Sequence, residues 1–489
     1  MRSMWLIAAF LCGLPGSKAR AQAFDGQPSQ SPSTQPIVHS VPQQGETPVA
    51  GASSAKTSDV PPSGSPARTL IDPTTPVIPL TRSQAEQLAI QNNPRITADH
   101  LLALAAGQVT RETRSNLLPQ VTGYVTGEEA EDGSRIGAGA GLTSSRLYSH
   151  FGAGGTVSQL ITDFGHTREL VATNKLQQEA LNKTTAATQE DVIFAADEAF
   201  YRLLDAQSLL DVARATVNAR GDVQNLTNAL TKSALKSTLD LNIASADLSQ
   251  SQLLELDAQN AVASASASLA EILATPADTF YKAVEDVAQA PPPPPDIHGY
   301  RAMNKEAQTD RPDLQSLKLN AKSFQTLARA QELQHLPSIS ALGTGGTTPA
   351  APAGVFVPDW YAAGGVNLTL PAFTGFRIRA QTEEARLRQR ATEKQAQELS
   401  DVVAREVRVA LLNAQTAFDR IGVTDQFRNQ TAQALALAKT RYKLGLSSIV
   451  ELSQAQLQST QAEVTSVNAR YNYLLSLRSL EYARGQLAP

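Results

Sequence analysis

Few residues in this chain are suited to chemistry, and they stand far apart. Histidine is the usual general base and metal ligand near neutral pH, and the chain has six histidines, at positions 39, 100, 150, 166, 298 and 335. Metal sites need ligands at short, regular spacings, which this set lacks. The only cysteine, Cys12, lies near the N-terminus, so no disulfide or thiol nucleophile is expected in the remainder. The sequence therefore predicts no metal and no cofactor.

One triplet, Asp163-Phe164-Gly165, also occurs in protein kinases, where its aspartate binds Mg²⁺. A kinase needs in addition a glycine-rich phosphate loop and a catalytic loop, and the sequence contains neither of them, nor a Ser/His/Asp motif. The triplet stands between an alternating segment and a long helical one, where a glycine lets the chain turn a corner. We interpret it as such a corner, and the protein is not expected to be an enzyme.

The first 23 residues are typical of a secretory signal peptide. Arg2 supplies the positive charge, residues 4–14 form the apolar segment, and Ala21-Gln22-Ala23 is a small-residue cleavage site. A lipid anchor at Cys12 is the alternative, but Leu11 stands where such an anchor needs a small residue. Cleavage after Ala23 is the favoured interpretation, and the protein is expected to be exported.

Residues 24–78 are rich in Pro, Ser, Gln and Thr, a composition that predicts a disordered arm. The net charge of −4 offers no basic surface, so no nucleic acid is expected as a partner. After the signal peptide, no apolar run reaches the length of about 18 residues that a transmembrane helix needs. Any insertion of this chain into a membrane is therefore expected to occur through strands.

A single glycine, Gly445, separates two long segments of helical character. The segment before it, residues 376–444, has one glycine and no proline. Glycine readily adopts the positive φ with which a helix ends and the chain reverses. Ser447 or Ser448 can cap the returning helix, with Glu451 in its first turn, where a carboxylate suits the helix dipole. The pattern predicts the tip of a very long helical hairpin.

The same pattern occurs once more in the first half of the chain. Asp240 lies 211 positions before Glu451, and Ala234 stands where Gly445 would be, so that this turn is expected to be made differently. Nearer the start of each half, Pro94 and Pro312 match at an offset of 218. We infer that the chain is an internal duplication.

Each repeat is expected to contain a helix, two strands and a long helical hairpin. Residues 79–290 form the first repeat and 301–487 the second, and a polyproline linker at 291–300 joins them in an equatorial collar. Segments of alternating polarity predict four strands, at about 119–128, 150–163, 337–345 and 360–371. The rods that follow, at 165–233 and 376–444, would each span on the order of 100 Å as a helix.

Four strands are too few to close a membrane barrel, and an open sheet would leave unpaired backbone groups in lipid. If the strands do not form an ordinary soluble hairpin, the chain must therefore oligomerise with cyclic symmetry. Two copies would give a barrel of eight strands filled by side chains, whereas three copies give twelve strands and leave a conduit. A trimer is favoured.

Several motifs resemble the TolC-type outer-membrane efflux protein family over about residues 80–487. They are Leu80-Thr81 with Asn92-Asn93-Pro94, Leu117-Leu118-Pro119, Leu368-Thr369-Leu370-Pro371-Ala372-Phe373, Arg441-Tyr442-Lys443-Leu444-Gly445 and Ala469-Arg470-Tyr471-Asn472-Tyr473-Leu474. The resemblance implies a mainly α protomer with a membrane β-barrel part, assembled as a homotrimer whose twelve-stranded barrel continues into a long periplasmic α-barrel. It also implies the outer membrane of a Gram-negative bacterium, with extension into the periplasm.

The function that the resemblance implies is the passive exit duct of a tripartite efflux system for small molecules. The expected partners are two further copies of the chain, a periplasmic adaptor (membrane fusion) protein, an inner-membrane transporter and outer-membrane lipid. Within the same fold, a duct for type I protein secretion is the alternative. An alternative of another class is a periplasm-spanning structural protein without a pore.

The resemblance also assigns roles to residues at the hairpin tips. Family members contact the adaptor with these ends, which gives Leu235, Lys236, Gly445, Leu446, Ser447 and Ser448 here. They close the periplasmic end with acidic rings and with polar links between the two hairpins. Glu451 is then the first ring, and Asp240 with Tyr442 is the link. The second ring position is the neutral Gln454, so we expect weaker block by cations than two acidic rings would give.

Overall fold

The computed structural model describes residues 77–128, 135–136, 145–146, 150–285, 292–347 and 360–487. All of them belong to one compact unit, Ala67–Pro489. The predicted signal peptide, its cleavage site after Ala23 and nearly all of the predicted arm lie outside the described residues. The arm prediction is wrong at its end, because Val77 and Ile78 belong to a strand, β1 (Val77–Leu80).

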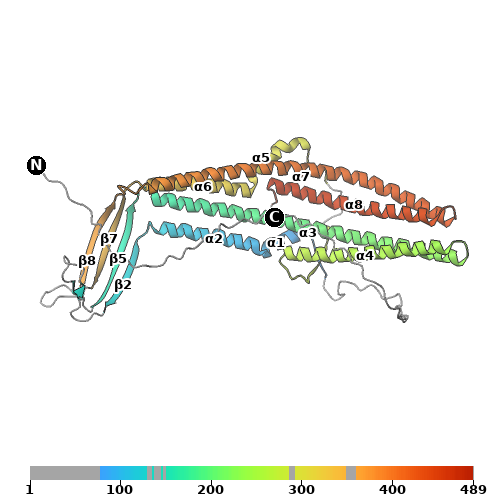
Figure 1. Ribbon diagram of the computed structural model, residues 1–489, viewed down its shortest axis with the longest axis horizontal. Helices are drawn as coiled ribbons and strands as arrows, with labels where there is room; N and C mark the ends of the chain where they lie inside the picture. Colours follow the sequence, from blue (N-terminus) through green and yellow to red (C-terminus); the bar gives the residue numbers. More distant parts are fainter. Residues whose placement is uncertain are drawn as a thin grey trace, which may run out of the picture. The chain divides into compact units, whose positions relative to one another are not determined.

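Four long helices make up two hairpins, whose course can be followed in Figure 1. In the first, α3 (His166–Lys232) is followed by α4 (Thr238–Ile272), and in the second, α7 (Arg377–Lys443) by α8 (Ile449–Arg484). Both α3 and α7 have 67 residues, which corresponds to about 100 Å at 1.5 Å per residue. The two helices of each hairpin pack along each other, and α8 also packs against α3 and α4. The two hairpins therefore form one continuous helical body.

Shorter helices extend this body along α3 and α7. These are α1 (Arg82–Asn92), α2 (Pro94–Ser115), α5 (Tyr300–Asp310) and α6 (Pro312–Leu333). The helical segment is divided at Pro94, because the proline begins a new helix, and the Asn93 side chain accepts a hydrogen bond from the Arg95 N–H at 2.9 Å. Pro312 begins α6 in the same way in the second repeat. Proline suits the first position of a helix because its fixed φ is helical and its missing N–H is not needed there.

The strands that precede the long helices form one antiparallel sheet. Its order is β2–β5–β7–β8, and its members are β2 (Gln120–Glu128), β5 (His150–Thr162), β7 (Ser338–Thr347) and β8 (Trp360–Thr369). The two repeats meet in the middle of the sheet, where Thr156 of β5 pairs with Thr344 of β7. Two short strands, β3 (Arg135–Ile136) and β4 (Ser145–Arg146), pair with each other and lie between β2 and β5 in the sequence. Figure 1 shows the four-stranded sheet beyond the ends of α2, α3, α6 and α7.

A small parallel sheet, which the sequence did not lead us to expect, lies near the middle of the long helices. β1 pairs with β6 (Phe280–Ala283), so the start of the described chain is tied to the end of the first repeat. Tyr281 of β6 is buried and packs in a cluster with Leu80, Phe200, Leu203 and Leu269. The polyproline segment that follows leads to a short helix, η1 (Ile297–Gly299), and the Tyr473 hydroxyl donates a hydrogen bond to the Pro292 carbonyl.

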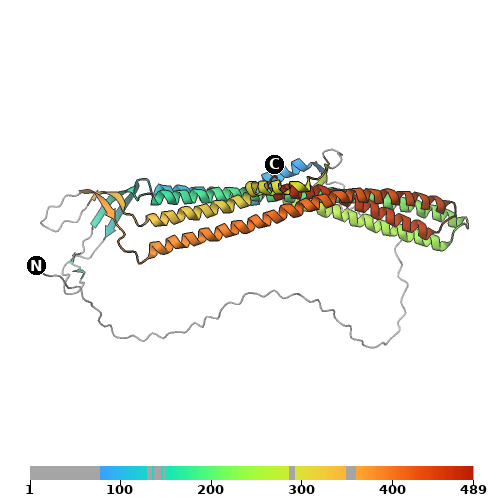
Figure 2. The ribbon, with the colours of Figure 1, turned by 90° about the horizontal axis from the view of Figure 1, so that it is seen from above.

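Small side chains at intervals of seven or fourteen residues line the contact between helices. Ala462, Ala469 and Ala483 of α8 and Ala244 and Ser251 of α4 are almost completely buried. Residues of this size allow two long helices to approach closely along their whole length. Figure 2 shows the resulting side-by-side course of the helices from a second direction.

Across the ranges described above, the helices do not combine the length and the apolar character that crossing a membrane requires.

Candidate functional site at the hairpin tips

Both hairpins reverse through the same backbone geometry. Gly445 has φ +75° and Ala234 has φ +57°. In each turn the residue after the one with positive φ donates a backbone hydrogen bond to the last turn of the helix. The Leu446 N–H donates to the Arg441 carbonyl at 2.8 Å, and the Leu235 N–H donates to the Leu230 carbonyl at 2.9 Å. These are the bonds of a Schellman motif. The expectation that Ala234 would force a different turn is wrong, because alanine accepts the left-handed region here at a cost of about 1 kcal/mol.

Serine side chains begin both returning helices. Ser237 and Asp240 form a capping box, in which the Asp240 N–H donates to Ser237 Oγ at 3.2 Å and the Ser237 N–H donates to the Asp240 carboxylate at 3.1 Å. In the second hairpin Ser448 caps α8 by accepting a hydrogen bond from the Glu451 N–H at 3.3 Å. Of the two serines proposed as caps, Ser448 is the one that acts. Ser447 instead has a buried Oγ without a hydrogen-bond partner among the described residues.

Tyr442 connects the two hairpins, but through a different partner from the one expected. Its side chain is fully buried in a cluster with Val223, Ile449 and Leu452. The Tyr442 and Thr227 hydroxyls form a hydrogen bond of 3.0 Å, and burial raises the pKa of the tyrosine. Within one protomer the hydrogen bond of Tyr442 therefore goes to Thr227. Asp240 caps α4, and its charge also raises the pKa of Tyr442, so the Asp240–Tyr442 link stays a prediction for the assembled trimer.

Lys236 is the second connection between the hairpins. Its half-buried side chain places Nζ 4.5 Å from the centroid of the Tyr442 ring, and Nζ donates a hydrogen bond to the Ser447 carbonyl at 3.4 Å. The family resemblance assigns Lys236 to the adaptor contact, and it assigns no role to Thr227. Thr227 and Tyr442 lie 215 positions apart, and only the packing of α3 against the second hairpin reveals their contact.

The acidic position at the start of α8 has a basic neighbour. Glu451 Oε1 lies 3.3 Å from Arg441 Nε, and both side chains are exposed. An exposed pair of this kind contributes about 0–1 kcal/mol to stability and leaves the carboxylate open to solvent ions. Gln454, one turn further along α8, is also exposed. Glu451 thus combines three features: a helix N-terminus, a neighbouring arginine and access to solvent.

The outer surface of the tips is apolar. Leu235 is 69% exposed and Leu446 is 66% exposed, and Leu239, Leu444 and Val450 are similarly accessible. A Cβ atom added at Gly445 would meet no heavy atom within 4 Å, so the glycine is required by its backbone conformation and not by crowding. Exposed leucines at the end of a long hairpin are typical of a surface that a partner covers.

Buried charges join three helices further along the body. The Asp197 carboxylate of α3 is fully buried and accepts a hydrogen bond of 2.5 Å from Arg478 Nε of α8, while Arg478 Nη2 lies 2.9 Å from Glu86 Oε1 of α1. Burial, assisted by the neighbouring Glu86, raises the pKa of Asp197 to about 7 despite the attraction of Arg478. Among the described residues, no group of three or more His, Cys, Asp or Glu side chains is arranged to hold a metal ion.

The geometry defines the class of the protein. Each repeat runs through two shorter helices, two strands of the sheet and a hairpin of about 100 Å, and apolar side chains are exposed on the sheet and at the tips. The family described as "Outer membrane efflux protein" matches residues 86–275 and 304–486. The chain belongs to this family. It is accordingly an outer-membrane protein that extends into the periplasm, and the mainly helical fold class predicted from the sequence is confirmed.

Individual relatives are distant but cover most of the chain. It is 24% identical to outer membrane protein TolC of Vibrio cholerae over 82% of this chain and 89% of that protein. It is also 24% identical to outer membrane protein TolC of Escherichia coli over 83% of this chain and 82% of that protein. The crystal structure of the outer membrane protein VceC from Vibrio cholerae is similar with a TM-score of 0.69 at 17% identity, over 83% of this chain and 96% of that one.

Proposed function

We propose that the protein is the exit duct of a tripartite efflux system, formed by three copies of the chain. The observation that carries the proposal is the sheet: β2 and β8 are its two edges among the described strands, and apolar side chains such as Val121, Val125, Val366 and Leu368 are exposed on it. Edge strands with unpaired N–H and C=O groups are not stable in lipid. Pairing of β8 in one copy with β2 in the next satisfies these groups.

Three copies give twelve strands, enough for a barrel with an open interior. The hairpins then form a second, helical barrel that leads away from the sheet. Their apolar tips, centred on Leu235 and Leu446, supply a surface for a periplasmic adaptor, which connects the duct to an inner-membrane transporter. The transporter supplies the energy, and the duct itself carries out no reaction on the small molecules that pass.

The test uses the full chain purified in detergent. We expect a trimer by mass measurement and a defined single-channel conductance after insertion into a planar lipid bilayer. A folded monomer that inserts alone would contradict the barrel, and a stable trimer without conductance would favour a structural protein without a pore. In cells, loss of the protein is expected to increase accumulation of a fluorescent dye. Loss of a secreted polypeptide with unchanged dye efflux would instead favour type I secretion.

A further inference from the structure

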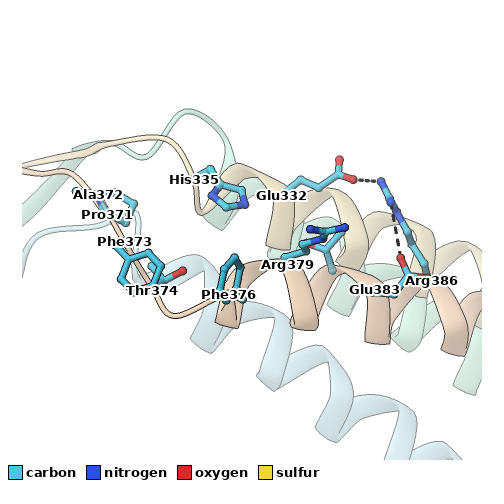
Figure 3. A pocket seen from close by; sticks show the side chains of 11 residues that line it. Glu332, His335, Pro371, Ala372, Phe373, Thr374, Phe376, Arg379, Glu383 and Arg386 are labelled. Atoms are coloured by element: carbon cyan, nitrogen blue, oxygen red, sulfur yellow. Dashed lines mark hydrogen bonds and ion pairs between the residues drawn. The ribbon is translucent and has the colours of Figure 1, made fainter.

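A pocket of about 580 Å³ lies where β8 leads into α7 (Figure 3). The corner between the two elements supplies Phe373 and Phe376. The end of α6 supplies Glu332, and the turn after it supplies His335. The first turns of α7 supply Arg379, Arg386 and other side chains. Figure 3 shows these side chains from α6 and α7 facing the same space. The pocket is thus built from α6, α7 and the corner that joins α7 to the sheet.

The two arginines in the pocket have different surroundings. Arg386 is neutralised, because it pairs with Glu332 across the pocket and lies 3.9 Å from Glu383 on its own helix. Arg379 forms no ion pair with any carboxylate of the described residues, and its side chain is exposed. Arg379 is therefore the one arginine of this lining without a carboxylate partner among the described residues, while the two lining carboxylates, Glu332 and Glu383, balance the two arginine charges overall.

The chain changes from apolar to cationic as it enters the pocket. Leu368 and Leu370 at the end of β8 are exposed, and Phe373 and Phe376 follow with 79% and 71% of their surface accessible. The two rings pack edge to face, with centroids 5.9 Å apart. Arg379 comes one helical turn after Phe376. Along a strand that crosses a bilayer, this is the order of hydrocarbon, interface and headgroup.

Neighbouring helix ends carry the same charge. Arg114 lies in the last turn of α2, Arg168 in the first turn of α3, Arg329 near the end of α6 and Arg377 at the start of α7, and all four are exposed. These helix ends are the ones adjacent to the sheet (Figure 1). Among the described residues, none of the four pairs with a carboxylate. Carboxylates lie at the same ends (Glu112, Glu169 and Glu332), so these arginines are single unpaired cations at this level and not a net positive surface.

We propose that the pocket binds the phosphate of a membrane phospholipid, with Arg379 on the phosphate and Phe373 and Phe376 against the glycerol and the first acyl carbons. This deepens the proposed function and rests on it, since it requires the sheet to lie in a bilayer. Arginine suits the phosphate because its planar guanidinium donates two parallel hydrogen bonds. Aromatic rings suit the interface, where one side of a group contacts water and the other contacts hydrocarbon.

The experiment measures lipid binding to the purified, delipidated trimer by native mass spectrometry. Dioctanoyl phosphatidylglycerol is the probe, and inorganic phosphate is the comparison. We expect Arg379→Gln to bind the lipid roughly tenfold more weakly, the loss expected for one charge-assisted contact. Arg390→Gln is the matched control, because it removes the same charge from an exposed site on α7 outside the pocket, and it is expected to bind as the wild type does.

A second variant separates lipid from free anion. Phe373→Ser is expected to weaken lipid binding while leaving phosphate binding unchanged, because only the lipid contacts the ring. Equal binding of phosphate and lipid would overturn the proposal in favour of a simple anion site. The proposal would also be overturned if both pocket variants bound the lipid as the wild type does. It would be overturned as well if no lipid bound because a neighbouring copy of the chain fills the pocket. Conductance recorded on the same preparations separates the two proposals. A trimer that conducts but binds no lipid contradicts the headgroup site and leaves the proposed duct intact. A trimer that binds lipid but does not conduct contradicts the duct.

Discussion

Lys236 of one hairpin places its ammonium group 4.5 Å from the centre of the Tyr442 ring of the other. The same ammonium group donates to the Ser447 carbonyl, and the tyrosine hydroxyl is bonded to Thr227. These three contacts cross from the first hairpin to the second within one chain. They hold the two tips together, and in the duct that we propose these contacts would have to break for this end to open.

The first prediction concerns this connection. Lys236→Met keeps the length of the side chain but removes its charge, and a cation–π contact of this kind is worth about 0.5–1 kcal/mol. We expect the variant trimer to show larger or more frequent openings in a lipid bilayer. Lys232→Met, which removes an exposed charge at the end of α3, is the control and is expected to behave as the wild type does. Identical openings in both variants would mean that Lys236 does not hold the tips.

The second prediction concerns the turn at Gly445. Valine at this position is strained by the positive φ at a cost of about 1–3 kcal/mol, and it changes the tip that we assign to the adaptor. Gly445→Val is expected to lower dye efflux in cells while leaving the amount of membrane trimer unchanged. Gly422→Val, inside α7 with open space around it, supplies the control. Normal efflux by Gly445→Val would mean that the tips are solvated turns without a partner.

The third prediction concerns Asp197, whose pKa is raised to about 7. Between about pH 4 and pH 7 the Asp197 carboxyl holds a proton in the folded state that it releases in the unfolded chain. Its contribution to the free energy of unfolding is therefore largest at low pH and is lost as the pH rises through about 7. Glu190 changes in the same direction, since burial raises its pKa to about 7. We expect the melting temperature to fall from pH 5 to pH 8, and to fall less in Asp197→Asn.

Asp211→Asn is the control for that measurement, because Asp211 is exposed on the same helix. It is expected to keep the pH dependence of the wild type. A melting temperature of the wild type that rises between pH 5 and pH 8 would contradict the assignment to Asp197. Arg478, Arg82 and Glu86 face this carboxylate, so variants at those positions would change the same profile.

Local signals explain which parts of the fold could be predicted from the sequence. The rods expected at 165–233 and 376–444 are α3 and α7, because long segments nearly free of glycine and proline favour helix and a left-handed residue ends each one. The pairing of β1 with β6 was missed, since each strand has only four residues and their contact depends on the packing of α3 and α4. Thr227 was missed for the same reason: its role depends on a residue 215 positions away.

The turn at Ala234 illustrates a different limit. Sequence preference treats glycine as the residue for positive φ, but a helix end held by two backbone hydrogen bonds can impose that conformation on alanine. The penalty is small compared with the packing of a 67-residue helix along its neighbours. Local preference is therefore a reliable guide to where the chain turns and a weaker guide to how it turns.

The last prediction concerns Glu451 at the start of α8. In a trimer, three copies of this carboxylate near the symmetry axis would attract cations and repel anions, most strongly at low salt. Arg441 lies 3.3 Å away and offsets part of the charge, and Gln454 adds none, so we expect only modest cation selectivity and weak block by divalent cations. Glu451→Gln is expected to abolish both in single-channel recordings, and Glu463→Gln, further along α8, is expected to retain them. If conductance, selectivity and block are the same in Glu451→Gln as in the wild type, the carboxylate serves only the helix start, and the constriction lies elsewhere.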